Sequence, residues 1–178
     1  MMAKVDASSD RGAQGSSAPS LHDLYLAHRL SLVRLASLLL HDLGDAEEVV
    51  QDAFVAAYKR WDRVREPERA LAYLRSAVLN GARSRLRHRG VVARWTLPSA
   101  GRAPAVEDAV VVDEQRERII VALQTLPTRQ RECLVLRYYL ELSESEIAAT
   151  LGISAGSVKT HSHRALATLA QRLEVEAQ

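Results

Sequence analysis

One predicted helix near the end of this 178-residue chain carries polar side chains whose types and spacing suit the reading of DNA bases. Between residues 155 and 173 they recur at steps of three and four, which places them on one face of a helix. They are Ser157, Thr160, His161, Arg164 and Thr168. Hydroxyl and guanidinium groups hydrogen-bond to base edges in the major groove. Lys159 lies nearer the apolar edge, and we assign it to a phosphate. The alternative interpretation is a polar face that only contacts water.

The segments around this helix favour DNA binding over that alternative. Ser143, with Glu146 three residues later, has the capping-box pattern that starts a helix, and Gly152 is expected to end that helix. Ser154 can cap the next helix. Its predicted apolar face consists of Val158, Ala165, Leu166, Leu169 and Leu173. Two short helices joined at a glycine turn predict a helix-turn-helix.

A second row of polar and aromatic side chains follows a helix predicted from about residue 70 to residue 89. The row consists of Tyr73, Ser76, Asn80, Arg83 and Arg87, opposite an apolar stripe of Leu71, Leu74, Val78, Ala82 and Leu86. Guanidinium groups bind phosphates, an amide bonds base edges, and a tyrosine ring stacks on an unpaired base. A solvated arginine-rich helix is the alternative. Residues 59–102 hold 12 Lys or Arg and three acidic residues, a net +9, which favours nucleic acid.

The segment before this helix has the opposite charge. Residues 42–54 contain five acidic side chains and no Lys or Arg, although the whole chain is only +2. Within a helix predicted over residues 45–61, Val50, Phe54, Ala57 and Trp61 form the core face. Acidic residues in a first turn complement the helix dipole, which alone would explain them. The acidic stretch should repel a polyanion that the basic stretch attracts.

Composition and periodicity set the fold class. The residues are 47% hydrophobic and 26% charged, and 178 residues suffice for one domain or two small ones. Residues 1–20, rich in Ser and Gly, predict a disordered leader, and helical periodicity covers 21–90. Pro98, Gly101 and Pro104 indicate a flexible linker over 91–113. Helical periodicity returns over 114–173 with about four short helices, and Pro127 suits the first turn of its helix. The prediction is an all-α protein of two small helical domains.

Enzyme and metal chemistry find no support in the sequence. Cys133, the single cysteine, cannot form an internal disulfide and is interpreted as a buried structural thiol. His161 and His163 point to opposite sides of their helix, so they cannot grip one ion. We expect no metal, no cofactor and no enzymatic activity. With no long apolar run, we also expect a cytoplasmic protein without membrane insertion.

Taken in order, these segments resemble a bacterial RNA polymerase sigma factor of the extracytoplasmic-function (ECF) class. The stretch Asp45–Phe54 is similar to the core-binding helix of sigma domain two, and Leu71–Leu74 with Asn80 and Arg83 resembles its promoter-melting segment. Leu126-Pro127, Gln130–Glu132, Ser143–Ile153, Gly156–Lys159 and Arg164-Ala165 resemble sigma domain four. The resemblance implies domain two over residues 21–90 and domain four, the helix-turn-helix domain, over 114–178.

The resemblance also implies partners and sites. The chain would bind core RNA polymerase, promoter DNA and an anti-sigma factor. The implied polymerase contacts are Asp45, Glu48, Gln51 and Asp52. The implied contacts to the minus-ten element are Arg63, Arg65, Tyr73, Asn80, Arg83 and Arg87, and those to the minus-thirty-five element are Ser157, Lys159, Thr160, His161 and Arg164. A stand-alone regulator of the LuxR type is the alternative, since residues 158–161 also resemble its recognition helix, but it leaves the first module unexplained.

Overall fold

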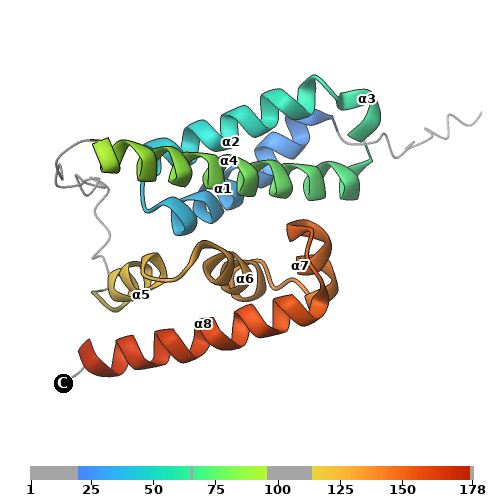
Figure 1. Ribbon diagram of the computed structural model, residues 1–178. Coiled ribbons are helices and arrows are strands. Elements are labelled where there is room, and N and C mark those ends of the chain that lie inside the picture. The colour runs from blue at the N-terminus through green and yellow to red at the C-terminus, as the bar shows by residue number, and fades with distance from the viewer. Residues whose placement is uncertain (1–19, 65, 96–113, 177–178) are drawn as a thin grey trace, which may run out of the picture.

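The computed structural model describes residues 20–64, 66–95 and 114–176, which form helices and short turns and contain no strand. The helices are α1 (Leu21–Leu40), α2 (Leu43–Tyr58), α3 (Trp61–Val64), α4 (Pro67–Trp95), α5 (Glu114–Gln124), α6 (Thr128–Tyr138), α7 (Glu144–Leu151) and α8 (Ala155–Glu176). Helices α1–α4 form the N-terminal lobe and α5–α8 the C-terminal lobe, one beneath the other in Figure 1. The all-α prediction is confirmed.

Local sequence explains where the first two helices begin. Ser20 caps α1 in a full capping box with Asp23, whose backbone N–H donates to the Ser20 hydroxyl at 3.2 Å. In return the Ser20 hydroxyl and backbone N–H donate to the Asp23 carboxylate at 2.7 and 2.9 Å, and these two bonds lower the pKa of that carboxyl. Asp42 caps α2 by accepting from the backbone N–H of Asp45 at 2.8 Å. Between these helices His41 adopts a left-handed backbone with φ 52°, so the chain turns sharply and α2 packs back on α1.

Three predicted boundaries were wrong by a few residues. The helix predicted over residues 45–61 ends at Tyr58, and Trp61 begins the separate helix α3. Helix α4 does not end at Gly90 but continues to Trp95, five residues into the expected linker. A glycine ends a helix when it takes a positive φ, and within the described residues only Gly152 does so among the glycines. Pro127 is the N-cap of α6, with φ −53° and ψ 140°, and not part of its first turn. The expected leader, except Ser20, and the remaining linker residues 96–113 lie outside the described residues.

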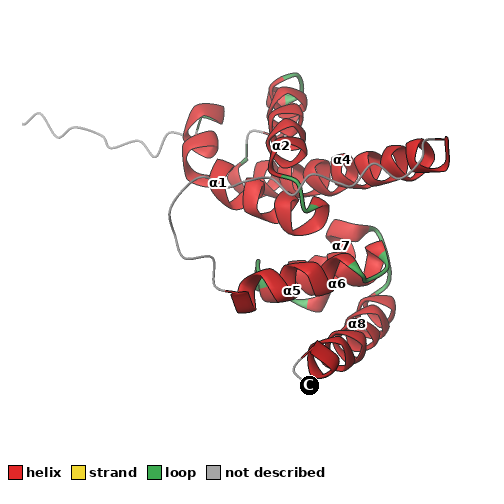
Figure 2. Ribbon diagram, turned by 90° about the vertical axis from the view of Figure 1, so that its left-hand side faces the viewer, coloured by secondary structure: helices red, strands yellow, loops and turns green. Residues whose placement is uncertain are grey.

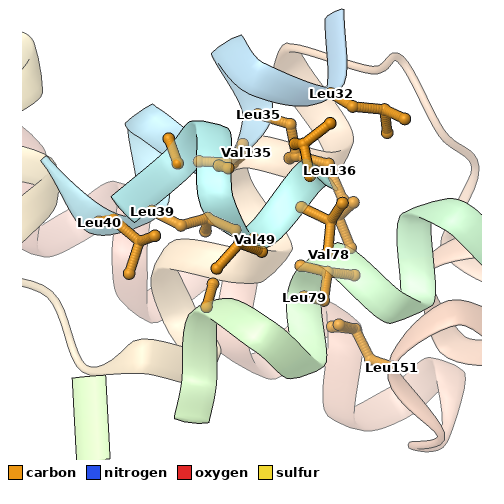
Figure 3. Packing of buried hydrophobic residues seen from close by; sticks show 14 of the residues in the cluster. Leu32, Leu35, Leu39, Leu40, Val49, Val78, Leu79, Val135, Leu136 and Leu151 are labelled. Carbon is orange, nitrogen blue, oxygen red and sulfur yellow. The ribbon is translucent and has the colours of Figure 1, made fainter. Parts of the chain in front are cut away.

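One apolar cluster runs through both lobes. In the N-terminal lobe α1, α2 and α4 pack on one another through leucine, valine and alanine side chains, such as Leu35, Val50 and Leu79. In the C-terminal lobe α8 packs against α5, α6 and α7. Figure 3 shows Leu32 and Leu35 of α1 beside Val135 and Leu136 of α6, where the two lobes share the cluster. Because only 4% of the residues are aromatic, the cluster consists mainly of aliphatic side chains.

The two lobes contact each other along α1 and α4. Helix α1 packs against α5 and α6, and α4 packs against α7; Figure 2 shows the C-terminal lobe lying along these helices. Polar bonds reinforce the contact: the side-chain amide of Gln124 donates to the Leu38 carbonyl at 2.9 Å. The Tyr139 hydroxyl donates to the Ser31 carbonyl at 3.4 Å. Among the described helices, none combines the length and apolar character needed to span a bilayer.

Candidate functional site

Helices α7 and α8 form the predicted helix-turn-helix. The Ser143 hydroxyl accepts from the Glu146 backbone N–H at 3.3 Å, and the Ser143 backbone N–H donates to the Glu146 carboxylate at 2.8 Å. The Ser143 hydroxyl also donates to the Glu146 carboxylate at 2.6 Å, and this bond is the main reason that the pKa of Glu146 lies below its usual range. Gly152 ends α7 with φ 66°, and the Ser154 hydroxyl accepts from the Ser157 backbone N–H at 3.1 Å. The predicted capping residues are therefore confirmed.

The two faces of α8 differ in burial. On the inner face Val158 and Ala165 are completely buried and Ser162 nearly so. The prediction that Leu166 belongs to this face was wrong, because it lies about 80° around the helix from Val158 and is 43% exposed. On the outer face Lys159, Thr160 and Arg164 are exposed, while Ser157 and His161 are half-buried. The face predicted to read DNA is open to a ligand.

The predicted row along α4 has a different environment. Asn80 and Arg87 are exposed, but Tyr73 is half-buried and packs against the shared apolar cluster. Arg83 reaches Glu132 of α6 across the lobe interface: its Nε lies 2.5 Å from Oε1 and its Nη2 donates to Oε2 at 2.9 Å. Its Nη1 also donates to the Asn80 side-chain oxygen at 2.9 Å. The middle of the row therefore faces the C-terminal lobe.

Glu132 is a functional candidate that sequence reasoning missed. Its side chain is 1% exposed, and Arg129, three residues earlier on α6, adds a second cation at 3.2 Å. Buried carboxylates need such partners because their desolvation is costly. The available signal was its place directly before the apolar run Cys133–Leu136, which put an acidic residue on a helix that had to be buried.

The acidic residues of α2 partly neutralise the arginines of α4. Asp45 pairs with Arg85 at 3.0 Å and also with Arg89, which lies 3.0 Å from Asp42. Glu48 pairs with Arg85 at 2.5 Å, and this hydrogen bond is the main cause of the raised pKa of the Arg85 guanidinium. The acidic and basic stretches of the sequence therefore bind each other inside the N-terminal lobe. A role of Asp45 and Glu48 in binding a partner stays a prediction.

A groove of about 560 Å³ runs between α1 and α2 beside the remaining acidic face. The rings of Tyr25 and Phe54 meet edge to face in its wall, with centroids 5.1 Å apart. Val55 and Tyr58 contribute exposed apolar surface, the tyrosine being 72% exposed. Gln51 lines this groove, and Asp52 is exposed one residue further along α2.

Three predicted residues remain, and one of them lies outside the described part of the chain. Arg63 lies exposed on α3, whereas Arg65 lies outside the described residues. Cys133 is fully buried, as predicted, and burial raises the pKa of its thiol to about 11. In the parts of the chain that the structure describes, His, Cys, Asp and Glu side chains form no group of three suited to a metal ion.

Both halves of the chain match known protein families. The family model of sigma-70 region 2 matches residues 24–91, and that of sigma-70 region 4 matches residues 116–169. The RNA polymerase sigma-E factor of Streptomyces avermitilis is 38% identical over 146 residues, which cover 81% of this chain and 79% of that protein. The ECF RNA polymerase sigma factor SigM of Mycobacterium tuberculosis is 31% identical over 154 residues, covering 84% and 75% of the two chains.

Solved structures agree with this assignment. The sigma factor RpoE of Bartonella quintana, in complex with the anti-sigma factor NepR, superposes with a TM-score of 0.66 over 86% of this chain and 96% of that one; at 24% identity it supports the fold. CnrH, in complex with the cytosolic domain of CnrY, has a TM-score of 0.64 and 28% identity over 87% and 88% of the two chains. Because both modules match in order, the LuxR-type alternative is not favoured. The chain belongs to the sigma-70 family of RNA polymerase sigma factors, in its ECF class, and is a transcription initiation factor.

Proposed function

We propose that this sigma factor binds core RNA polymerase through α2 and the groove between α1 and α2. The groove is lined by the apolar side chains of Phe54, Val55 and Tyr58 and by the exposed polar side chain of Gln51. An apolar centre with a polar rim is the usual composition of a protein interface. Asp52, exposed next to Gln51 on α2, also suits a protein partner better than DNA, since its carboxylate repels phosphates.

The outer face of α8 is proposed to read the minus-thirty-five element. Arg164 and Thr160 are exposed on it, whereas Val158 and Ala165 hold the helix against α6 and α7 from the other side. The Thr160 hydroxyl donates to the Gly156 carbonyl at 2.9 Å, which leaves its oxygen free to accept a bond from a base. Lys159, exposed at the margin, is proposed to contact a phosphate.

The row on α4, together with Arg63 and Arg65, is proposed to bind the minus-ten element and to help melt it. An aromatic ring, an amide and guanidinium groups suit unpaired bases: Tyr73 stacks, Asn80 bonds base edges, and Arg83 and Arg87 hold the backbone. Capturing a flipped base stabilises the open strand and so favours melting.

The observation that carries this proposal is the exposed polar face of α8 opposite its buried face, in a chain whose two modules match sigma regions 2 and 4 in order. The test is reconstitution with core RNA polymerase on a promoter library. Promoter-specific transcripts are expected, and Arg164→Ala should lose minus-thirty-five binding. Arg172→Ala is the matched control, since Arg172 is exposed on the same helix two turns further on. DNA binding without core polymerase, and no transcripts, would instead support a stand-alone regulator.

We further propose that an anti-sigma protein regulates this chain, that the chain acts in the cytoplasm, and that it has no catalytic role. These proposals rest on the family membership. Co-purification of the chain with a partner that blocks its reconstituted transcription would test the first.

A further inference from the structure

We propose that an open pocket between α4 and α6 binds a small anion through a phosphate group. The pocket has a volume of about 310 Å³. Its lining residues are Arg83, Leu86 and Arg87 of α4 with Thr128 and Arg129 of α6. Arg83 and Arg87 also belong to the row proposed for the minus-ten element. The pocket differs from that row because it includes residues of α6 and because its ligand is a small molecule.

The charge of the pocket favours an anion with two negative charges. Three of its lining side chains are guanidinium groups, and none of them is acidic. The buried carboxylate of Glu132 pairs with Arg83 and with Arg129. One carboxylate for three guanidinium groups leaves two positive charges. A phosphate monoester carries close to two negative charges at pH 7, so it would neutralise them.

Arg87 is the guanidinium group that this carboxylate does not reach. Its neighbours Arg85 and Arg89 on the same helix pair with acidic side chains of α2. Arg87 forms no ion pair and no hydrogen bond with any residue that the structure describes. A cleft lined by charges of one sign concentrates the electric field. An anion therefore gains more beside Arg87 in this pocket than beside a single exposed arginine.

Donors that could hold a phosphate come from both helices. Arg83 uses three of its five N–H groups within the protein, and two remain. Arg129 donates through Nη1 alone, so its Nε and Nη2 are uncommitted. Within the described part of the chain, the Thr128 hydroxyl also makes no hydrogen bond. Guanidinium groups bind phosphate oxygens through paired N–H donors. The oxygens of one tetrahedral phosphate can thus accept from α4 and α6 at the same time.

The size and lining of the pocket limit the rest of the ligand. A volume of about 310 Å³ is at the lower end of the range for small-molecule pockets. Leu86 is its one apolar lining side chain, and no aromatic ring is present for a nucleobase to stack on. DNA carries a single negative charge per nucleotide, which neutralises half of the pocket's charge. The ligand class is therefore inorganic phosphate or a small metabolite with a terminal phosphate.

The test is a titration of the full chain with inorganic phosphate in a chloride buffer, followed by phosphorus NMR. Arg87→Gln removes one guanidinium group without breaking an ion pair, and Thr128→Val removes the hydroxyl of α6 while keeping the shape of the side chain. Arg69→Gln is the matched control, because Arg69 is exposed on the same helix and pairs with Glu66 at 2.8 Å. Circular dichroism verifies that each variant is folded. Thermal melts would mislead, since phosphate also stabilises folded proteins by exclusion from their surface.

We expect the dissociation constant for phosphate to rise about tenfold in Arg87→Gln, because a charge-assisted hydrogen bond is lost. The rise should be about two- to tenfold in Thr128→Val, where the lost bond is neutral. Arg69→Gln should bind phosphate as tightly as the unchanged chain. Unchanged binding in either Arg87→Gln or Thr128→Val overturns a site shared by the two helices.

Two further ligands identify the source of the phosphate group. Glycerol phosphate is a monoester, and a single-stranded minus-ten oligonucleotide contains only diesters. Tighter binding of inorganic phosphate assigns the pocket to the free ion, and tighter binding of glycerol phosphate assigns it to a metabolite. Binding of the oligonucleotide without either small anion, or of no ligand at all, overturns the inference. A reconstitution without promoter-specific transcripts overturns the proposed function and leaves the phosphate titration unaffected.

Discussion

Arg131 of α6 donates a hydrogen bond to the carbonyl oxygen of Leu39, at the C-terminal end of α1, with an N···O distance of 2.6 Å. The same guanidinium binds the Leu126 carbonyl at 3.3 Å and the side-chain oxygen of Gln124. Burial lowers the pKa of Arg131, but arginine keeps its charge in proteins. A cation at a helix C-terminus is favourable. Arg131 therefore links the C-terminal end of α1 to the turn between α5 and α6 across the lobe interface.

Arg131→Met should therefore weaken the fold more than the loss of an exposed arginine does. The methionine keeps apolar contact but leaves the Leu39 and Leu126 carbonyls without this donor, and we expect a loss of roughly 1.5–3 kcal/mol in the free energy of unfolding. Urea denaturation measures it. Arg137→Met is the control: its pair with Glu144 is about 40% exposed on both sides, and its removal should cost under about 1 kcal/mol. Equal losses would contradict the account.

Asp45→Ala and Gln51→Ala should separate the structural from the binding role of α2. Asp45 ties α2 to Arg85 and Arg89, so its removal should lower the free energy of unfolding by about 1–2 kcal/mol, counting both ion pairs and the helix dipole. Gln51 is exposed beside the groove, and its removal should leave stability unchanged while weakening polymerase binding. Thermal melts and a core-binding titration give the two readings. A stable Asp45→Ala protein would show that these ion pairs contribute nothing to the fold.

Two glycines of α4 should respond to alanine with opposite signs. A Cβ at Gly81 would lie 2.8 Å from a methyl group of Val49, a buried and β-branched residue that cannot turn away within its helix. Such overpacking costs about 1–3 kcal/mol, which outweighs the gain in helix propensity of about 1 kcal/mol. At Gly90 a Cβ meets nothing within 4 Å, so Gly90→Ala should stabilise the protein by up to about 1 kcal/mol. Paired thermal melts measure both; a gain at Gly81 would place α2 and α4 further apart than described.

The Cys133 thiol should alkylate slowly and with a shifted pH dependence. With its pKa raised to about 11 from 9.0, mainly by burial, about one thiol in a thousand is ionised at pH 8, against about one in ten in an unfolded chain. The rate with iodoacetamide should thus be at least about 100-fold lower in the native protein and rise tenfold per pH unit between 8 and 10. The denatured chain should level off above pH 9. Equal alkylation rates of the native and denatured protein at pH 8 would show that the Cys133 thiol is accessible in the native fold.

Features set by neighbouring residues could be predicted from the sequence. The boundaries of α7 and α8 follow from Ser143, Gly152 and Ser154, because each acts on backbone groups within four residues. The alternation of apolar and polar positions likewise predicted an all-α fold. Even so, the margin of a face was ambiguous, since Leu166 lies far enough around α8 to be exposed.

Contacts between distant segments could not be predicted in this way. Helical phase showed that Arg83 lies on a polar face, but it could not say whether that face meets water, DNA or a carboxylate 49 residues further on. In the same way the charge counts separated an acidic from a basic stretch without showing that Asp45 binds Arg85, 40 residues away. Complementary charges on two helices form ion pairs when folding brings the helices together. A count of charges along the sequence does not show which of them meet.

The apolar cluster shared by the two lobes also bears on how long the free chain survives in a cell. Leu32 and Leu35 on α1 lie beside Val135 and Leu136 on α6 in one buried cluster, so parting of the lobes would expose apolar side chains on both. A protease that cuts transiently opened chains works in proportion to the open population. We expect the packed form to protect the chain between its synthesis and its capture by polymerase. Variants that open the lobes should then be degraded faster.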